Sequence, residues 1–275
     1  MTYDVIVIGG GPAGLSGAVA LGRALRAVLV IDSGAPRNAP AEGIHNYLTR
    51  DGMRPAEFLA AGREEVRRYG GTVLDGEVTA ARGGLEGGFT VELADGSAHQ
   101  AKRLLVTTGL KDQLPDIPGL AEQWGQTLLH CPYCHGYEVR GRSIGVIAVN
   151  ERAPEQARLW GQWSPDVQII PGGDIAAVEP KGVRLKDGTF VARDALVIAA
   201  RVAARAEFLV TLGLEVAEHP SGAGTHVPAV DPTGRSAVPG VWVAGNVADP
   251  MAQVISSAAA GLQAGAMINV DLIED

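Results

Sequence analysis

The fold is decided by the stretch YDVIVIGGGPAG at residues 3–14. Its first half is a short, β-branched apolar run that predicts a buried strand, and the small residues from Leu15 to Leu25 predict a helix after it. The glycines between them fit the pattern G-x-G-x-x-G, which permits a tight turn and lets the backbone approach a pyrophosphate. The residues expected at that pyrophosphate are Gly9, Gly11, Pro12, Ala13 and Gly14.

A second apolar run at 28–31 predicts the next strand, which ends at Asp32. Asp32 stands 18 residues after Gly14, where dinucleotide-binding folds place an acid that binds ribose. The combined pattern therefore predicts a dinucleotide-binding α/β domain, against the alternative of an ordinary strand–turn–helix unit. The motif alone does not distinguish FAD from a nicotinamide dinucleotide.

The composition limits the class of protein. A formal net charge of −8 over 275 residues disfavours a nucleic-acid partner, because such binding needs basic surface. With 46% hydrophobic residues, the chain has enough apolar surface for a large core, and we expect two domains. No apolar run approaches the roughly 18 residues that cross a bilayer, and the first residues lack a signal-peptide pattern. We therefore expect a cytoplasmic protein with no membrane partner.

The two cysteines of the chain, Cys131 and Cys134, both lie in the stretch HCPYCHGYE at 130–138. A pattern C-x-x-C-H has four interpretations: covalent haem, zinc with His130 or His135, a buried inert pair, or a redox-active disulfide. Haem attachment requires export, and neighbouring residues rarely all reach one tetrahedral zinc ion. We favour the redox-active disulfide and expect no metal.

The late stretch VPGVWVAGNVADP at 238–250 predicts a strand that enters a Gly-Asn turn, followed by a helix that runs through Met267. With the GGGPAG start and the central C-x-x-C, it resembles the thioredoxin reductase family of two-domain flavoproteins over nearly the whole chain. The resemblance implies an α/β fold of two Rossmann-like FAD/NAD(P)-binding-type domains, the second inserted in the first and shortened. The implied FAD domain is 1–112 with 206–275, and the implied inserted, degenerate NADPH-type domain is 113–205.

The resemblance also implies which residues contact FAD. Asn46 matches a position beside the flavin, and Thr107-Thr108-Gly109 matches a turn that closes over the cofactor. Asn246 stands where the family has an Asp that hydrogen-bonds the ribityl chain, so one negative charge is lost there. A helix that opens at Gln253 would direct its positive dipole end at the reduced flavin. The implied set is Asn46, Thr108, Gly109, Gly245, Asn246, Gln253 and Val254.

By the family pattern, Cys134 lies against the flavin and Cys131 exchanges with the substrate. His135 departs from this pattern, because ordinary thioredoxin reductases have an Asp there. The dithiol oxidases for gliotoxin and holomycin have C-x-x-C-H, and the chain resembles that branch. His135 would then remove a proton from an incoming dithiol, unless it is only a surface or capping residue. Glu138 either orients His135 or is solvated.

The predicted second domain departs from a nicotinamide site. Its strand at 143–149 and helix at 154–163 are joined by residues without glycine, and Glu151 stands where phosphates would lie. The strand at 167–170 is followed by Pro-Gly-Gly-Asp in place of the arginines that bind a 2′-phosphate. NADPH binding is therefore doubtful.

The expected function is FAD-dependent oxidation of a dithiol to a disulfide through Cys131 and Cys134, with dioxygen as acceptor. One alternative is a thioredoxin-reductase-like disulfide reductase that receives electrons from NADPH, ferredoxin or another flavoprotein. An alternative of a different class is a non-catalytic, FAD-bound redox sensor. The expected partner is a small dithiol or disulfide, or a thioredoxin-like protein, and the resemblance implies a homodimer.

Overall fold

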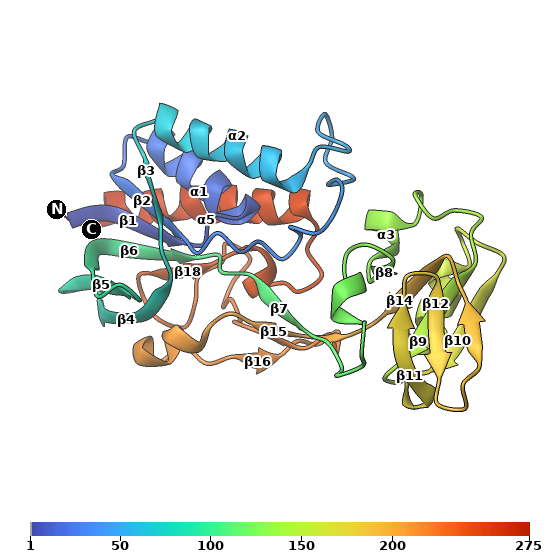
Figure 1. Cartoon of the computed structure of the whole chain (residues 1–275). Helices are drawn as coiled ribbons and strands as arrows, with labels where there is room; N and C mark the ends of the chain where they lie inside the picture. The colour runs from blue at the N-terminus through green and yellow to red at the C-terminus, as the bar shows by residue number, and fades with distance from the viewer. Residues whose placement is uncertain (1) are drawn as a thin grey trace. The chain divides into compact units, whose positions relative to one another are not determined.

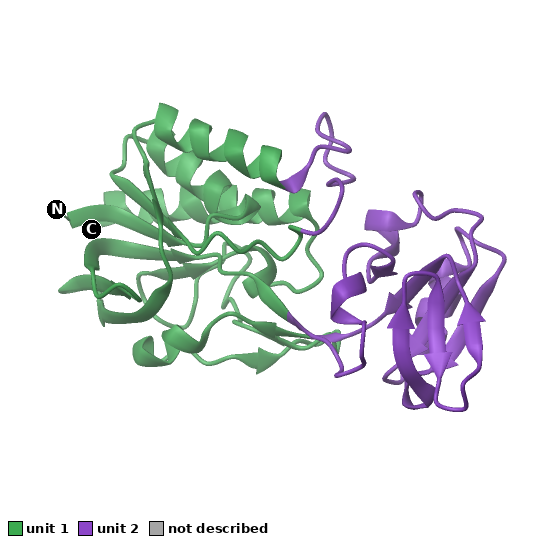
Figure 2. Ribbon diagram, in the orientation of Figure 1, with its two compact units in different colours: residues 1–39, 56–111, 202–275 green, residues 40–55, 112–201 purple. Residues whose placement is uncertain are grey.

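The computed structural model describes residues 2–275 and divides the chain into two compact units (Figures 1 and 2). Unit 1 contains residues 1–39, 56–111 and 202–275, and unit 2 contains residues 40–55 and 112–201. This division differs from the expected one by a few residues at each boundary. It also groups 40–55, expected in the FAD domain, with the inserted segment.

Unit 1 is built on a seven-stranded sheet in which β3, β2, β1, β6, β5 and β4 lie in that order and β18 also pairs with β6. Its parallel strands are β1 (Thr2–Ile8), β2 (Val28–Asp32), β3 (Thr72–Asp75), β6 (Ala98–Val106) and β18 (Val241–Val243). The strands β4 (Val78–Gly84) and β5 (Gly88–Leu93) add an antiparallel hairpin. The expected strand, turn, helix and strand at the start of the chain are thus confirmed.

Three helices belong to unit 1: α1 (Pro12–Arg23), α2 (Pro55–Arg68) and α5 (Val254–Glu274). Helix α2 begins at Pro55, and proline suits the first position of a helix. Helix α5 continues seven residues beyond the expected end at Met267. Its last turns are anchored by Asp271, which pairs with the buried Arg103 at 2.5 Å.

Helices α1 and α5 pack very closely, and Figure 1 shows them side by side. A methyl group on Gly261 would lie 1.9 Å from the Ala13 carbonyl oxygen, and one on Gly265 would lie 2.7 Å from that of Gly17. Alternating residues of β1 divide between two cores, with Val5 under these helices and Ile6 on the opposite face. The glycines therefore bring the starts of both helices to the same edge of the sheet.

Unit 2 contains a parallel sheet in the order β10-β9-β14-β8 and an antiparallel sheet in the order β11-β12-β13. The first comprises β8 (Leu128–Leu129), β9 (Ile144–Ala148), β10 (Val167–Pro171) and β14 (Ala195–Ile198). The second comprises β11 (Ile175–Glu179), β12 (Gly182–Leu185) and β13 (Phe190–Ala192). Its helices are α3 (Pro132–His135) and α4 (Ala153–Trp160), and Trp160 is fully buried in its core.

Two strands lead into and out of the segment 112–201 of unit 2. The chain leaves unit 1 along β7 (Leu110–Gln113) and returns along β15 (Arg201–Ala204), and these two strands pair with each other. A small hairpin of β16 (Ala217–Glu218) and β17 (Thr225–His226) follows in unit 1. Among residues 2–275, no helix has both the length and the apolar character needed to span a membrane.

Candidate active site

The turn between β1 and α1 requires glycine at two positions and leaves a third open. Gly9 has a φ of +108°, and a methyl group there would lie 2.5 Å from the Thr107 carbonyl oxygen. A methyl group on Gly14 would lie 1.9 Å from the Gly9 carbonyl oxygen. No atom lies within 4 Å of a methyl group built on Gly11, the residue that caps α1. The Cα of Gly11 at this helix start therefore faces open space.

The expected FAD-contacting segments of unit 1 meet around this turn. The Thr107 hydroxyl donates to the Gly9 carbonyl oxygen at 2.7 Å, which fixes the end of β6 against the turn. The Thr108 hydroxyl donates to the Arg205 carbonyl oxygen at 2.6 Å, and Gly109 follows with a φ of +72°. Gly245 has the same φ, and a methyl group there would lie 2.7 Å from the Ala13 Cβ.

Asp32 lies beside the glycine turn, as a ribose-binding acid requires. A methyl group on Gly10 would lie 2.8 Å from the Asp32 carboxylate. The carboxylate also forms an ion pair with Arg63, whose second nitrogen contacts Asp75 at 2.9 Å. Arg63 is a residue that the sequence reasoning missed, because a charged position on a surface helix gives no signal of what it faces.

Asn246 and the start of α5 complete this edge of unit 1. The Asn246 amide donates to the carbonyl oxygens of Asp249 at 3.1 Å and Ala252 at 2.8 Å, so it holds the loop that leads into α5. The helix starts at Val254 with Gln253 as its cap residue. The first N–H groups of α5, like those of α1, have no partner within their own helix. Both helix starts lie at one edge of the sheet.

These features fit FAD. The start of α1 suits the pyrophosphate, the start of α5 suits the reduced flavin, the open space at Gly11 admits a close approach, and Asp32 suits a ribose hydroxyl. The individual roles of these residues stay predictions.

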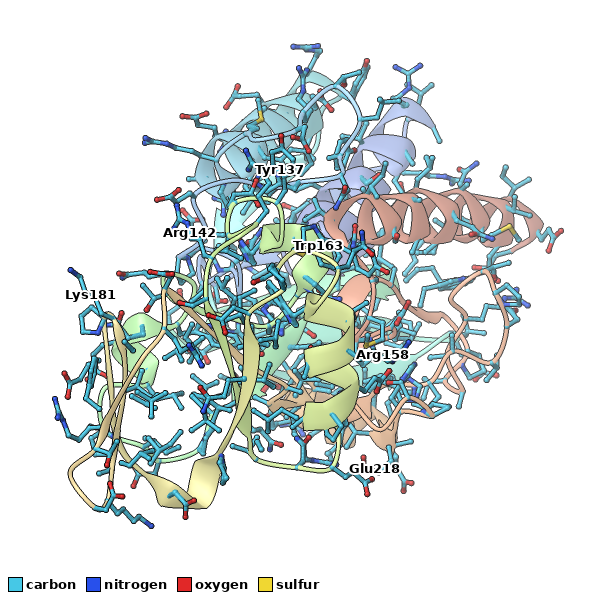
Figure 3. All side chains as sticks on the ribbon, turned by 90° about the vertical axis from the view of Figure 1, so that its right-hand side faces the viewer. Tyr137, Arg142, Arg158, Trp163, Lys181 and Glu218 are labelled. Carbon is cyan, nitrogen blue, oxygen red and sulfur yellow. A yellow bond between two sulfur atoms is a disulfide. The ribbon has the colours of Figure 1, made fainter. Side chains whose placement is uncertain are left out.

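In unit 2, Cys131 and Cys134 form a disulfide across α3, with Cα atoms 5.2 Å apart. Cys131 caps the helix, and Pro132 occupies its first position. The helix ends at Gly136, where a methyl group would lie 2.5 Å from the Pro132 carbonyl oxygen and 2.7 Å from the Trp163 ring. Trp163, labelled in Figure 3, therefore packs against the end of the disulfide-bearing turn.

His135 is the last residue of α3 and directly follows the second cysteine. Burial lowers the pKa of His135; the Glu138 carboxylate opposes this shift, and the positive charge of His45 adds to it. An imidazole with a lowered pKa is neutral at physiological pH, so its free nitrogen can accept a proton. The role of His135 as a proton acceptor beside the thiols stays a prediction.

Residues 44–53 form a closed loop that contacts the disulfide turn. Asn46 has a φ of +60°, and its amide donates to the Tyr133 carbonyl oxygen at 2.7 Å. The His45 ring places one nitrogen 3.3 Å from Asp51 and the other 3.7 Å from Glu138. The sequence analysis considered Asn46 as a flavin contact and did not predict that Asp51 lies beside His45. The Asp51-Gly52 turn signal was the available hint of a closed loop.

The other histidine of the motif, His130, stacks on Trp124 with ring centroids 5.4 Å apart. Across residues 2–275, His, Cys, Asp and Glu side chains form no group of three or more that could hold a metal ion.

The junction between β9 and α4 is the counterpart of the glycine turn in unit 1, and its residues do not fit a dinucleotide. The Asn150 amide donates to the Ala199 carbonyl oxygen at 2.7 Å, and its oxygen accepts the Arg152 N–H at 3.0 Å. Glu151 next to it is exposed and acidic. The Arg152 N–H is thus already satisfied. The Glu151 carboxylate stands beside it, where a phosphate would need positive potential.

Comparisons with known proteins agree with this description. Residues 3–150 match the family described as pyridine nucleotide-disulphide oxidoreductase. The thioredoxin reductase sirT of Leptosphaeria maculans is 31% identical over 97% of this chain and 93% of its own length. The thioredoxin reductase tcpT of Claviceps purpurea is 33% identical over 99% and 95%. The crystal structure of HlmI superposes with a TM-score of 0.91 at 40% identity, covering 99% of this chain and 93% of that one. An oxidoreductase from Agrobacterium tumefaciens superposes with a TM-score of 0.92 at 33% identity, covering 100% and 99%.

Proposed function

Because the chain belongs to the pyridine nucleotide-disulphide oxidoreductase family, as an FAD-dependent, thioredoxin-reductase-like thiol/disulfide oxidoreductase, we propose that it oxidises a small dithiol to a disulfide with dioxygen as the final acceptor. The observation that carries the direction of the reaction is the pairing of two features of unit 2. A histidine with a lowered pKa stands beside the disulfide, and at the β9–α4 junction Asn150 occupies the Arg152 N–H next to the exposed Glu151.

The cysteines exchange electrons with the substrate in two bond changes. A substrate thiolate bonds to the Cys131 sulfur, and the bond from Cys131 to Cys134 breaks, which leaves Cys134 as a thiolate. The second substrate thiolate attacks the first substrate sulfur, closes the product disulfide and releases Cys131. The substrate has then lost two protons and two electrons, and the electrons are on the cysteine pair.

His135 accepts a proton from the incoming dithiol and stabilises the thiolate at Cys134. Asn46 holds the backbone of the disulfide turn through its bond to the Tyr133 carbonyl oxygen. Bound FAD supplies the acceptor for the two electrons, which reach dioxygen with the two protons and yield hydrogen peroxide.

Anaerobic mixing of the yellow protein with dithiothreitol tests this function. We expect the flavin band to bleach and to return on admission of air, with one hydrogen peroxide formed per dithiol oxidised. In Cys134→Ser, the band should stay oxidised, because the cysteine pair cannot take up two electrons. Bleaching of that variant at the normal rate would contradict the assignment of Cys134, and failure of peroxide to form in the unaltered protein would contradict dioxygen as the acceptor.

Replacement of the proton acceptor gives a graded test. In His135→Ala, flavin reduction by dithiothreitol should slow by about 10²-fold, the usual scale for loss of a general base. His219→Ala is the matched control, because His219 lies in unit 1, where its ring contacts Ser221 and His226. An unchanged rate in His135→Ala would reduce His135 to a structural residue.

We also propose that the protein is a homodimer and acts in the cytoplasm. Helix α5 supports the dimer, because it exposes apolar side chains at Ile255, Leu262, Val270 and Ile273. Their spacing of 7, 8 and 3 residues places them along one face of the helix. Light scattering of the purified protein should give twice the chain mass, and Leu262→Glu should give the monomer. Cell fractionation tests the location.

A further inference from the structure

Arg63 is a charged residue on the core-facing side of helix α2. It lies four residues after Leu59 and three before Val66, and both of these side chains are buried in the core beneath the helix. Residues at this spacing share one face of a helix. Only 21% of the Arg63 side chain is exposed. A guanidinium in this place needs anionic partners, because an unpaired charge removed from water is strongly destabilising.

The partners of Arg63 are two carboxylates that end neighbouring strands of unit 1. Asp32 is the last residue of β2 and Asp75 is the last of β3, and they occupy paired positions in these parallel strands. The Arg63 Nη2 contacts the Asp32 Oδ2, and the Arg63 Nη1 lies 2.9 Å from the Asp75 Oδ1. One guanidinium therefore bridges both acids at the carboxyl edge of the sheet, where open α/β sheets bind ligands.

The two carboxylates differ in their access to solvent. The Asp32 side chain is 14% exposed, and that of Asp75 is 81% exposed. Water screens the charge of Asp75 well and that of Asp32 poorly, so Asp32 depends more on the guanidinium. Asp32 is also the acid beside the glycine turn, since a methyl group on Gly10 would lie 2.8 Å from its carboxylate.

We propose that Arg63 is a positioning residue for FAD and acts through Asp32. It orients the Asp32 carboxylate and offsets its negative charge next to the pyrophosphate. The ion pair uses Oδ2 of Asp32, which leaves Oδ1 to accept a hydrogen bond from a ribose hydroxyl. This inference rests on Asp32 as the ribose-binding acid and is independent of the direction of the thiol reaction.

The charges give the sign of the effect. The glycine turn beside Asp32 is the expected place of a pyrophosphate, and two negative groups at one edge of the sheet repel each other. Without Arg63, this repulsion would weaken FAD binding, and the Asp32 carboxylate would lose the contact that fixes its orientation. Loss of Arg63 should therefore raise the Kd for FAD even though Arg63 itself is assigned no contact with the cofactor.

Titration of the apoprotein with FAD, followed by flavin fluorescence, tests this inference without turnover. In Arg63→Met, which keeps an unbranched apolar stem, the Kd for FAD should rise by about tenfold. Arg63→Lys keeps the positive charge but cannot bridge two carboxylates as a guanidinium does, so it should recover part of the loss. Arg67→Met is the matched control and should leave the Kd unchanged, because Arg67 lies one turn further along α2 and pairs with Glu64 of the same helix.

The same titration in an Asp32→Asn background separates positioning from other roles. If Arg63 acts through Asp32, adding Arg63→Met to Asp32→Asn should raise the Kd by about twofold or less, since a neutral amide needs no counter-charge. An equal loss in both backgrounds would overturn the inference, because Arg63 would then contact FAD or support the fold independently of Asp32. An unchanged Kd in Arg63→Met alone would overturn it as well.

Circular dichroism of each apoprotein shows whether the variant is folded. If Arg63→Met is not, Arg63→Lys in the two backgrounds decides the question by the same comparison: a loss confined to the protein that retains Asp32 supports the inference, and equal Kd changes overturn it. Dithiol oxidation plays no part in this titration, so failure of the proposed function would leave its result standing.

Discussion

The two units of this protein contain the same local arrangement, a parallel strand followed by a turn and a helix, and use it differently. Between β1 and α1, the turn consists of glycines, and a methyl group on Gly11 would meet no atom within 4 Å. Between β9 and α4, the Asn150 side chain occupies the turn with two hydrogen bonds, and the exposed Glu151 adds a negative charge. A shared fold element thus carries no nucleotide site by itself, since the site depends on backbone left free by small residues.

The difference also bears on the route of electrons. In unit 1, the first N–H groups of α1 and α5 have no partner within their own helix and can face a cofactor. In unit 2, the Arg152 N–H is satisfied by the Asn150 side chain, and the disulfide and His135 are partly exposed. A nicotinamide donor is therefore replaced by the substrate dithiol in the proposed function.

The largest effect is expected where the glycine turn is most crowded. In Gly14→Ala, the new methyl group would lie 1.9 Å from the Gly9 carbonyl oxygen, so α1 cannot keep its place against β1. We expect the purified variant to lose its FAD, measured as the ratio of absorbance at the flavin band to that of the protein. A variant with full flavin content would mean that the close packing of this turn is not required.

The second test asks whether the two turns really differ in nucleotide binding. Under anaerobic conditions, excess NADPH should leave the flavin band oxidised, because Asn150 already occupies the Arg152 N–H at the β9–α4 junction and the exposed Glu151 stands beside it. Dithiothreitol added to the same cuvette is the internal control and should bleach the band. Prompt bleaching by NADPH would abolish the contrast between the units and favour a disulfide reductase.

A smaller effect is expected at the open position of the glycine turn. Gly11→Ala makes the same chemical change as Gly14→Ala, but the methyl group meets no protein atom, so folding should be unaffected. FAD affinity should fall by about tenfold, equivalent to about 1.4 kcal/mol, because the methyl group takes space that the pyrophosphate needs. Titration of the apoprotein with FAD measures this. Equal losses in Gly11→Ala and Gly14→Ala would show that crowding does not separate the two positions.

The smallest effect concerns the filled turn of unit 2. Asn150→Ala removes the acceptor for the Arg152 N–H and the donor to Ala199, and it should lower the free energy of unfolding by about 1 kcal/mol. Asn150→Asp keeps the acceptor and should recover part of that loss. Thermal unfolding measures both. If Asn150→Ala were as stable as the unaltered protein, the side chain would not be what holds this turn.

The sequence predicted the features that local residue patterns determine. The strand, glycine turn, helix and strand at the start of the chain follow from β-branched runs on either side of Gly9 to Gly14, and the structure confirms them. The extension of α5 beyond Met267 could not be predicted in the same way. It depends on Asp271 pairing with Arg103 and on Asn269 accepting from Arg26 at 2.7 Å, and these partners are distant in sequence.

The candidate site shows the same limit. Cys131, Cys134 and His135 were evident because they are consecutive members of one motif. The surroundings of this motif were not evident from the sequence. His45 precedes the motif by more than eighty residues, and only folding brings its ring to the Glu138 carboxylate. The grouping of 40–55 with unit 2 has the same cause, because the bond from Asn46 to Tyr133 spans 87 residues.

That grouping has a consequence for how such proteins can be recombined. Residues 40–55 belong to unit 2 by their contacts, yet unit 1 flanks them on both sides in the chain. A contiguous exchange of residues 112–201 between two relatives would carry over the disulfide and leave the donor's His45 loop behind. The product would combine a cysteine motif from one parent with a charge environment from the other. Chimaeras of this family should therefore retain the parental bond from Asn46 to the disulfide turn only when both segments are transplanted together.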